Sequence, residues 1–329
     1  MNCSRSRLRI AIDYRFAFRR VFSGSGLASA AACTALLVGT IHGWAAAEGQ
    51  ESGPKASNTP PVVRDLIWVW GNPEMAEAGA HTSATYAQAG PAERATLLGA
   101  RNIFMAGHGL PSSDQEAEAL MEQVAGFPRV VWEIAPDGEG DNRPFVYRET
   151  VARAKRLADR YPQIEGVLLD DMSSVGIDRG FKPEHIRRIR DGLSGEYARI
   201  KVWGVVYTIN LDREGIGDYV RELDVILLAE WHAKNVVHIE ENVARCTRLF
   251  PNKPIVLGLY LFDYGAGRRM PRDVLKQQCE AALKLAHAGR IRGIEFTTIT
   301  NDPQAVAWTA DWVRRVGDQR ITAGRAEGL

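Results

Sequence analysis

Two adjacent carboxylates, Asp170 and Asp171, follow directly after the apolar run Gly166–Leu169. If this run is a β-strand, neighbouring side chains point to opposite faces, so one carboxylate faces the interior and the other the layer behind it. Buried carboxylates need partners, because an unpaired buried charge is costly. The pattern predicts acid–base or nucleophilic chemistry here. A simpler alternative is that one aspartate caps the next segment and the other pairs with an arginine.

A second concentration of reactive groups follows the apolar run Leu227–Ala229. Glu230, Trp231, His232 and Lys234 bring a carboxylate, an indole, an imidazole and an ammonium group within five residues. If the strand continues, Glu230 and His232 share a face. We predict that Glu230 completes a catalytic pair, and the alternative is a plain salt bridge between Glu230 and Lys234.

Other apolar runs end in aromatic rings beside hydrogen-bonding groups. Flat rings next to polar side chains suit a sugar, which has apolar faces and polar edges. For any one ring alone, packing in the core is the alternative. We predict the following substrate-binding residues: Trp70, Asn72, His108, Glu133, Tyr207, Trp231, His232, Tyr260, Asp263, Glu295 and Arg268.

The elements that must position these groups are eight short apolar runs, about thirty residues apart and mostly separated by helix-like segments. This repetition predicts a single-domain (β/α)8 TIM barrel, in which chemistry lies at the carboxyl ends of the strands. The expected strands are Leu66–Trp70, Ala100–Met105, Val130–Ile134, Gly166–Leu169, Val202–Tyr207, Val225–Ala229, Ile255–Tyr260 and Gly293–Phe296.

The run Glu165–Met172 is similar to the strand-four motif of chitinase-like barrels, in which acids alternate and the last is the catalytic glutamate. Here Met172 stands in that last place and Leu168 replaces an acid. The octet of strands and its aromatic-rich mouth resemble the glycoside hydrolase type of TIM barrel, as found in exported bacterial proteins, without a specific family. α-Galactosidase-like enzymes pair a strand-four aspartate with a strand-six acid, and Asp170 and Glu230 fit that pairing by position.

The resemblance implies a carbohydrate-active hydrolase. Glycosidic cleavage needs one acid to protonate the leaving oxygen and a carboxylate to stabilise or capture the anomeric carbon. We expect Asp170 to be the nucleophile or charge stabiliser and Glu230 the general acid/base. Asp171 and His232 would support them.

Two other functions remain open. A metal-dependent isomerase-like or hydrolase-like barrel could draw a mixed nitrogen and oxygen site from several strand ends, although no H-x-H or H-E-x-x-H spacing supports it. The candidate ligands are His108, Glu133, Asp170, Glu230, His232 and Glu295. A non-catalytic glycan-binding barrel would keep the aromatics without needing paired acids. We expect no metal and no cofactor.

Composition limits the partners. The chain has 329 residues, is 45% hydrophobic and 25% charged, and carries a net charge of +1, which gives no electrostatic reason to expect nucleic acid. The expected partner is an oligo- or polysaccharide. Arg268 and Arg269, after the seventh strand, could clamp a carboxylate or sulfate on an acidic sugar. The alternative is a solvated loop whose arginines meet helix acids.

The N-terminus has the pattern of an export signal. Arginines precede a weakly apolar stretch and the cleavage-type sequence Ala45-Ala46-Ala47. We expect a signal peptide over 1–47, a flexible leader over 48–61, the barrel over 62–317 and a disordered tail over 318–329. The mature protein would be periplasmic or extracellular, without stable membrane association. The general secretory and twin-arginine routes remain open, and an uncleaved anchor is the alternative.

Two cysteines, Cys246 and Cys279, remain after that cleavage. They lie on expected helices of consecutive barrel units. A disulfide or two buried thiols would both fit this placement.

Overall fold

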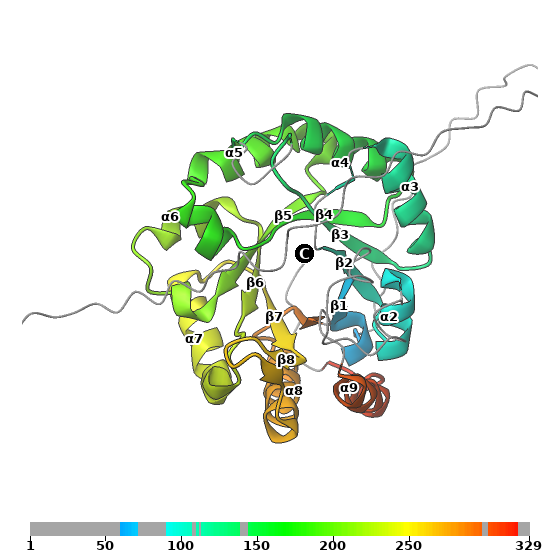
Figure 1. The fold of residues 1–329 in the computed structure, drawn as a ribbon, viewed down its shortest axis with the longest axis vertical. Helices are drawn as coiled ribbons and strands as arrows, with labels where there is room; N and C mark the ends of the chain where they lie inside the picture. Colours follow the sequence, from blue (N-terminus) through cyan, green and yellow to red (C-terminus); the bar gives the residue numbers. More distant parts are fainter. Residues whose placement is uncertain are drawn as a thin grey trace, which may run out of the picture. The chain divides into compact units, whose positions relative to one another are not determined.

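A computed structural model describes residues 60–71, 90–106, 110–111, 113–138, 144–297 and 302–321. Eight parallel strands close into a barrel in the order β1-β10-β7-β6-β5-β4-β3-β2, with helices around it (Figure 1). This is the (β/α)8 TIM barrel predicted from the sequence. The strands are β1 Ile67–Gly71, β2 Asn102–Met105, β3 Arg129–Glu133, β4 Ile164–Leu169, β5 Lys201–Tyr207, β6 Val225–Ala229, β7 Ile255–Tyr260 and β10 Gly293–Thr297.

The outer helices cover the strands with amphipathic faces. In α4, for example, Val151, Ala154, Leu157 and Ala158 recur at helical spacing and are all buried. Asp302 caps α9 by accepting from the amide of Gln304 at 3.0 Å. The helices are α2 Pro91–Leu98, α3 Asp114–Gln123, α4 Arg148–Arg160, α5 Pro183–Gly192, α6 Ile216–Glu222, α7 Ile239–Leu249, α8 Arg272–His287 and α9 Pro303–Val316.

Several short elements lie at the carboxyl ends of the strands, an end that we call the mouth. A π-helical turn follows β4, 3-10 turns follow β5 and β6, and a small antiparallel hairpin follows β7. These are η3 Met172–Gly176, η5 Thr208–Asn210, η6 Ala233–His238, and β8 Phe262–Asp263 with β9 Arg268–Arg269. The periodic pattern of the sequence did not predict them.

Large rings fill the barrel interior. Trp68, Phe104 and Trp203, from β1, β2 and β5, approach one another with ring centroids 4.8 to 5.4 Å apart. Gly166 on β4 makes room for this packing, because a Cβ there would lie 2.3 Å from Nε1 of Trp203. The interior is therefore a packed core, and the chemistry must lie above it.

The opposite end of the barrel is closed by polar pairing. Arg129 and Glu165 form a bidentate ion pair at 2.6 and 2.8 Å at the start of β3 and β4. Val62 bridges to Arg320, and the amide of Ile321 donates to Pro61 at 2.8 Å. The described chain thus reaches Ile321.

Three further sequence expectations concern the cysteines, membrane association and the termini. Cys246 on α7 and Cys279 on α8 are both buried free thiols, and burial raises the pKa of Cys246 to about 12. Within the described ranges, no helix has the length and hydrophobicity needed to cross a bilayer. The predicted signal peptide, most of the predicted leader and residues 322–329 lie outside the described ranges.

Candidate active site

The carboxyl end of β4 holds Asp170 and Asp171 in an unusual backbone turn. Asp171 has φ 48° and ψ 16°, and it is the one non-glycine residue with positive φ in the described part of the chain. This left-handed conformation costs free energy that the surroundings must offset. The amide of Asp171 donates to Oδ1 of Asp170 at 2.8 Å, so the turn fixes the two carboxylates relative to each other.

The end of β5 holds this turn in place. The hydroxyl of Ser173 accepts from the amide of Tyr207 at 3.1 Å, and the carbonyl of Ser173 accepts from Asn210 at 2.7 Å. The phenol of Tyr207 donates to Oδ1 of Asp171 at 2.6 Å. Burial raises the pKa of Tyr207 well above its usual value, so its hydroxyl stays a proton-bearing donor to Asp171.

The pKa of Asp170 is raised well above its usual value. Burial is the largest cause, and the negative charges of Asp171, Glu133 and Glu295 add to it, while the amide of Asp171 opposes it. The pKa of Asp171 is also raised by burial, against the hydrogen bond from Tyr207. The adjacent pair therefore retains a proton into the neutral range more readily than isolated aspartates would.

Glu295 on β10 extends the acidic cluster from the far side. It is buried, and burial raises its pKa to about 8. The hydroxyl of Thr297 donates to its carboxylate at 2.9 Å. The next strand, β7, leaves space for this carboxylate at Gly258, where a Cβ would lie 3.2 Å from Oε2 of Glu295. Burial also raises the pKa of Tyr260 well above its usual value, with the charges of Glu295 and Asp170 adding to it.

Three of these acids border one open cavity at the mouth. Its volume is about 240 Å³, and Glu133, Asp170 and Asp171 line it together with three aromatic side chains, Phe145, Tyr147 and Phe181. The rings of Phe145 and Phe181 pack edge to face at 5.1 Å. The cavity therefore has carboxylates from β3 and β4 and a facing group of rings, which is the combination that a sugar requires.

Glu230 has a different environment from Asp170. Its carboxylate accepts hydrogen bonds from the hydroxyl of Thr208, from the amide of His232 at 2.9 Å and from Asn235 at 3.2 Å. Nδ1 of His232 also lies 3.4 Å from Oε1 of Glu230. Glu230 is buried, and it is not among the residues that line the cavity of Asp170. No ion pair joins it to Lys234 in the described structure. The structure thus gives Glu230 a full set of internal partners.

Two predicted rings lie in distinct settings. The ring of Trp231 lies tilted against that of His232, with centroids 4.4 Å apart, and 6.1 Å from that of Tyr207, so it borders the tyrosine side of the mouth. Trp70 is buried and lies 6.1 Å from the ring of Phe104. Trp70 therefore belongs to the packed core. Asn72 and His108 fall outside the described residues.

In the loop after β7, one aspartate and two arginines have partners close by. Asp263 is buried and accepts from the amides of Ala233 and Ala266, each at 3.2 Å. Arg268 lies 3.5 Å from Asp263, and Arg269 lies 3.6 Å from Asp302. Each arginine thus has an acid within ion-pair distance, Asp263 in the same hairpin and Asp302 at the N-cap of α9.

The described residues contain no group of three or more His, Cys, Asp or Glu side chains arranged to hold a metal ion. His108, one of the candidate ligands, lies outside those residues. Asp170 and Glu295, whose pKa values are both raised, can hold protons at higher pH than ordinary carboxyl groups do.

Sequence reasoning missed the aromatic side of the cavity. Phe145 and Tyr147 come from the β3–α4 loop, and Phe181 follows the π-helical turn, so none of them ends a strand. Two aromatics just before a helix at the mouth were the available signal. Arg179, also outside the strand ends, lines the same cavity.

Comparisons with known proteins give a shared fold. No family model matches the chain, and no curated protein matches it in sequence. The GH99 endo-alpha-mannosidase from Bacteroides thetaiotaomicron is 10% identical with a TM-score of 0.53, covering 77% of this chain and 97% of that one. The spore cortex-lytic enzyme SleL of Bacillus cereus is 11% identical with a TM-score of 0.49, covering 77% and 75%. The PgaB (BpsB) glycoside hydrolase domain from Bordetella bronchiseptica is 12% identical with a TM-score of 0.47, covering 77% and 99%. The likeness to the mannosidase shows that the chain shares the TIM-barrel fold of a glycoside hydrolase, without an assigned family.

Proposed function

We propose that this protein hydrolyses glycosidic bonds in an oligo- or polysaccharide, using the acids at the carboxyl ends of β3 and β4. The observation that carries the proposal is the shared cavity, in which Glu133, Asp170 and Asp171 lie together beside aromatic rings. The fold that the chain shares with glycoside hydrolases supports it as an analogy.

In this proposal Asp170 donates the proton to the leaving oxygen. A buried carboxyl with neighbouring negative charges keeps its proton to higher pH than an ordinary aspartate, and the protonated form is the state a general acid needs. Sequence position alone favoured a nucleophile or charge-stabilising role for Asp170. The electrostatic environment favours the donor role.

Glu133 is the proposed carboxylate partner. It borders the same cavity from the neighbouring strand, where it can stabilise positive charge on the sugar or activate water. Asp171, held by Tyr207, would keep Asp170 in place. Glu230 is the partner predicted from sequence, and a direct comparison of variants separates the two.

The test is turnover on a panel of neutral and acidic oligosaccharides. Asp170→Asn should abolish cleavage while preserving the fold and glycan binding. Asp178→Asn is the matched control, since Asp178 is exposed and pairs with Arg213 on the surface. If the native protein binds glycans but cleaves none of them, the barrel is a non-catalytic glycan binder. If turnover requires an added divalent metal, the metal-dependent alternative stands.

We also propose that the protein is exported. The basis is the arginine-rich start and the Ala45-Ala46-Ala47 pattern. N-terminal sequencing of secreted material should begin near Glu48. An intact N-terminus on a cytoplasmic protein would contradict export.

A further inference from the structure

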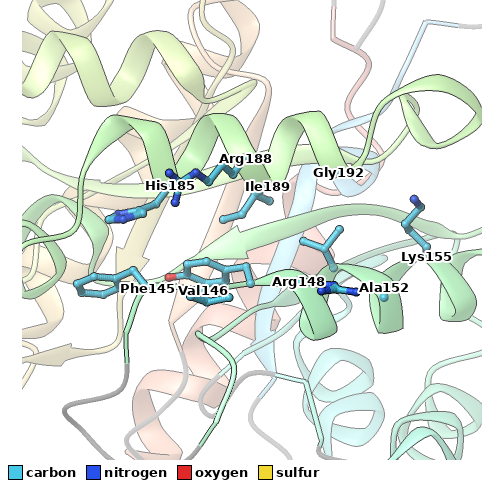
Figure 2. A pocket seen from close by; sticks show the side chains of 11 residues that line it. Phe145, Val146, Arg148, Ala152, Lys155, His185, Arg188, Ile189 and Gly192 are labelled. Carbon is cyan, nitrogen blue, oxygen red and sulfur yellow. The ribbon is translucent and has the colours of Figure 1, made fainter.

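A second cavity lies on the outside of the barrel, between α4 and α5. Its volume is about 330 Å³. Figure 2 shows side chains from both helices around it, with Phe145 and His185 toward one end and Lys155 toward the other. We call this cavity the α4–α5 groove; its charged lining residues are Arg148, Lys155, His185 and Arg188.

The groove adjoins the acid-lined cavity. Phe145 and Tyr147 line both of them. Both residues precede α4, at the mouth end of that helix, and the ring of Phe145 lies 5.4 Å from that of His185. A chain-like ligand with one part beside Asp170 could therefore pass over these rings and continue between the two helices.

The charge of the groove is one-sided. Arg148, Lys155 and Arg188 line it, and its lining residues include no acid. Arg188 makes no ion pair in the described structure, and Lys155 lies over the ring of Tyr197 at 4.5 Å. Three acids lie around the lining residues. Glu149 approaches Arg148 at 3.9 Å, with both side chains exposed, the charge of Glu184 acts on His185, and Asp159 accepts from the hydroxyl of Tyr197. Since the whole chain carries a net charge of +1, this is a local concentration of positive charge.

We propose that the α4–α5 groove binds the carboxylate-bearing distal part of the glycan chain whose cleavage site lies beside Asp170. This inference rests on the proposed hydrolase function and assigns its substrate class, an acidic polysaccharide. The rings of Phe145 and Tyr147 would support sugar faces at the entrance, and the cations would bind uronate carboxylates. Arg148 and Lys155 are about 10 Å apart along α4, so the contacts span more than one sugar ring.

Binding to defined polymers tests the proposal without requiring turnover. The probes are polygalacturonate, alginate and the fully methyl-esterified form of polygalacturonate, which keeps the backbone and removes the charge. The test variant is Arg148→Gln/Lys155→Gln/Arg188→Gln in the full chain. The control variant is Arg272→Gln/Lys276→Gln/Arg290→Gln. It removes the same number of positive charges from exposed positions on α8 and just after its end.

We expect the native protein to bind at least one acidic polymer and to bind the methyl ester more weakly. The groove variant should lose about tenfold in affinity for the acidic polymer, the combined effect of three exposed charge contacts, and should bind the ester as the native protein does. The control variant should bind like the native protein. Affinity should fall with added salt.

Four results would overturn the proposal: binding of neither acidic polymer, equal affinity for acid and ester, an equal loss in the control variant, or tighter binding of dextran sulfate at the groove. Self-association that the groove variant abolishes would instead identify a second copy of this chain as the occupant. Groove-dependent binding without cleavage of any glycan would refute the hydrolase and retain the binding site. Asp170-dependent cleavage with no preference for acidic chains would support the hydrolase function and refute the assigned substrate class.

Discussion

Strands β4 and β6 both run from an apolar core into a carboxylate, yet the two carboxylates differ in their surroundings. Asp170, after β4, accepts one hydrogen bond from the described residues, borders a cavity and has neighbouring negative charges. Glu230, after β6, accepts three hydrogen bonds and is enclosed by the turns that donate them. A carboxylate with a full set of internal donors stabilises its loop, whereas one beside a cavity can act on a ligand.

The difference begins with neighbours on other strands. Thr208, which donates to Glu230, belongs to the turn after β5, and the acids that raise the pKa of Asp170 come from β3 and β10 as well as β4. A carboxylate at the same point of a strand can thus be a structural anchor or a proton carrier. Four substitutions test this contrast.

Asp170→Asn should have the largest effect. We expect a loss of 10²- to 10⁴-fold in kcat, roughly the scale of a positioned general acid, because the amide cannot protonate a leaving oxygen. Initial-rate kinetics on a cleaved glycan measure it, with circular dichroism to check folding. Near-native turnover would remove Asp170 from the chemistry.

Glu295→Gln should change how stability depends on pH. The pKa of Glu295 in the folded protein is about 8, above its ordinary value of 4.5, so its contribution to stability is present at low pH and lost as pH rises toward 8. From about pH 5 to about pH 7.5 this group removes about 3 kcal/mol of unfolding free energy. The glutamine keeps an acceptor for Thr297 and should flatten that part of the curve.

Urea unfolding at several pH values measures the Glu295 effect, and the exposed Glu196→Gln is the matched control. The pKa of Asp170 is also raised, so this group changes stability in the same direction, and some slope should remain in Glu295→Gln. An unchanged slope would mean that Glu295 is already ionised in the folded protein.

Glu230→Gln should reduce stability more than chemistry. Three donors face this carboxylate, and a neutral amide cannot satisfy all of them, so we expect a loss of about 1 to 3 kcal/mol in unfolding free energy. Turnover by the folded fraction should stay within about tenfold of the native value. A hundredfold loss of kcat at unchanged stability would instead establish Glu230 as the acid predicted from sequence.

Tyr207→Phe should have the smallest effect. Its hydroxyl opposes the rise in the pKa of Asp171, so removing it should raise that pKa further. We expect about a tenfold loss in kcat/KM near neutral pH and a shift of the acidic limb of the pH–rate profile to higher pH. A uniform loss at all pH values would indicate that Tyr207 only packs against the site.

The sequence predicted the barrel closely because strand and helix periodicities are local. Strands β6 and β7 have the predicted bounds, and the other six barrel strands differ by one or two residues at one or both ends. It also placed Asp170, Glu133, Glu295 and Tyr207 at the mouth, since strand ends in this fold share one end of the barrel. Trp70, predicted to bind substrate, is buried beside Phe104. Phe145 and Phe181 do not end strands, so a search of strand ends could not find them.

What the sequence determined by itself is therefore the set of elements and the end of the barrel at which chemistry can occur, because the alternation of apolar residues requires no knowledge of distant contacts. Only the tertiary structure decided which acids share a cavity and which acid is enclosed by hydrogen-bond donors. It also decided that Arg148 and Arg188 line the same groove. Desolvation and Coulomb interactions depend on distance through space, and the residues concerned lie on different strands and helices. Their spacing along the chain carries no record of those distances.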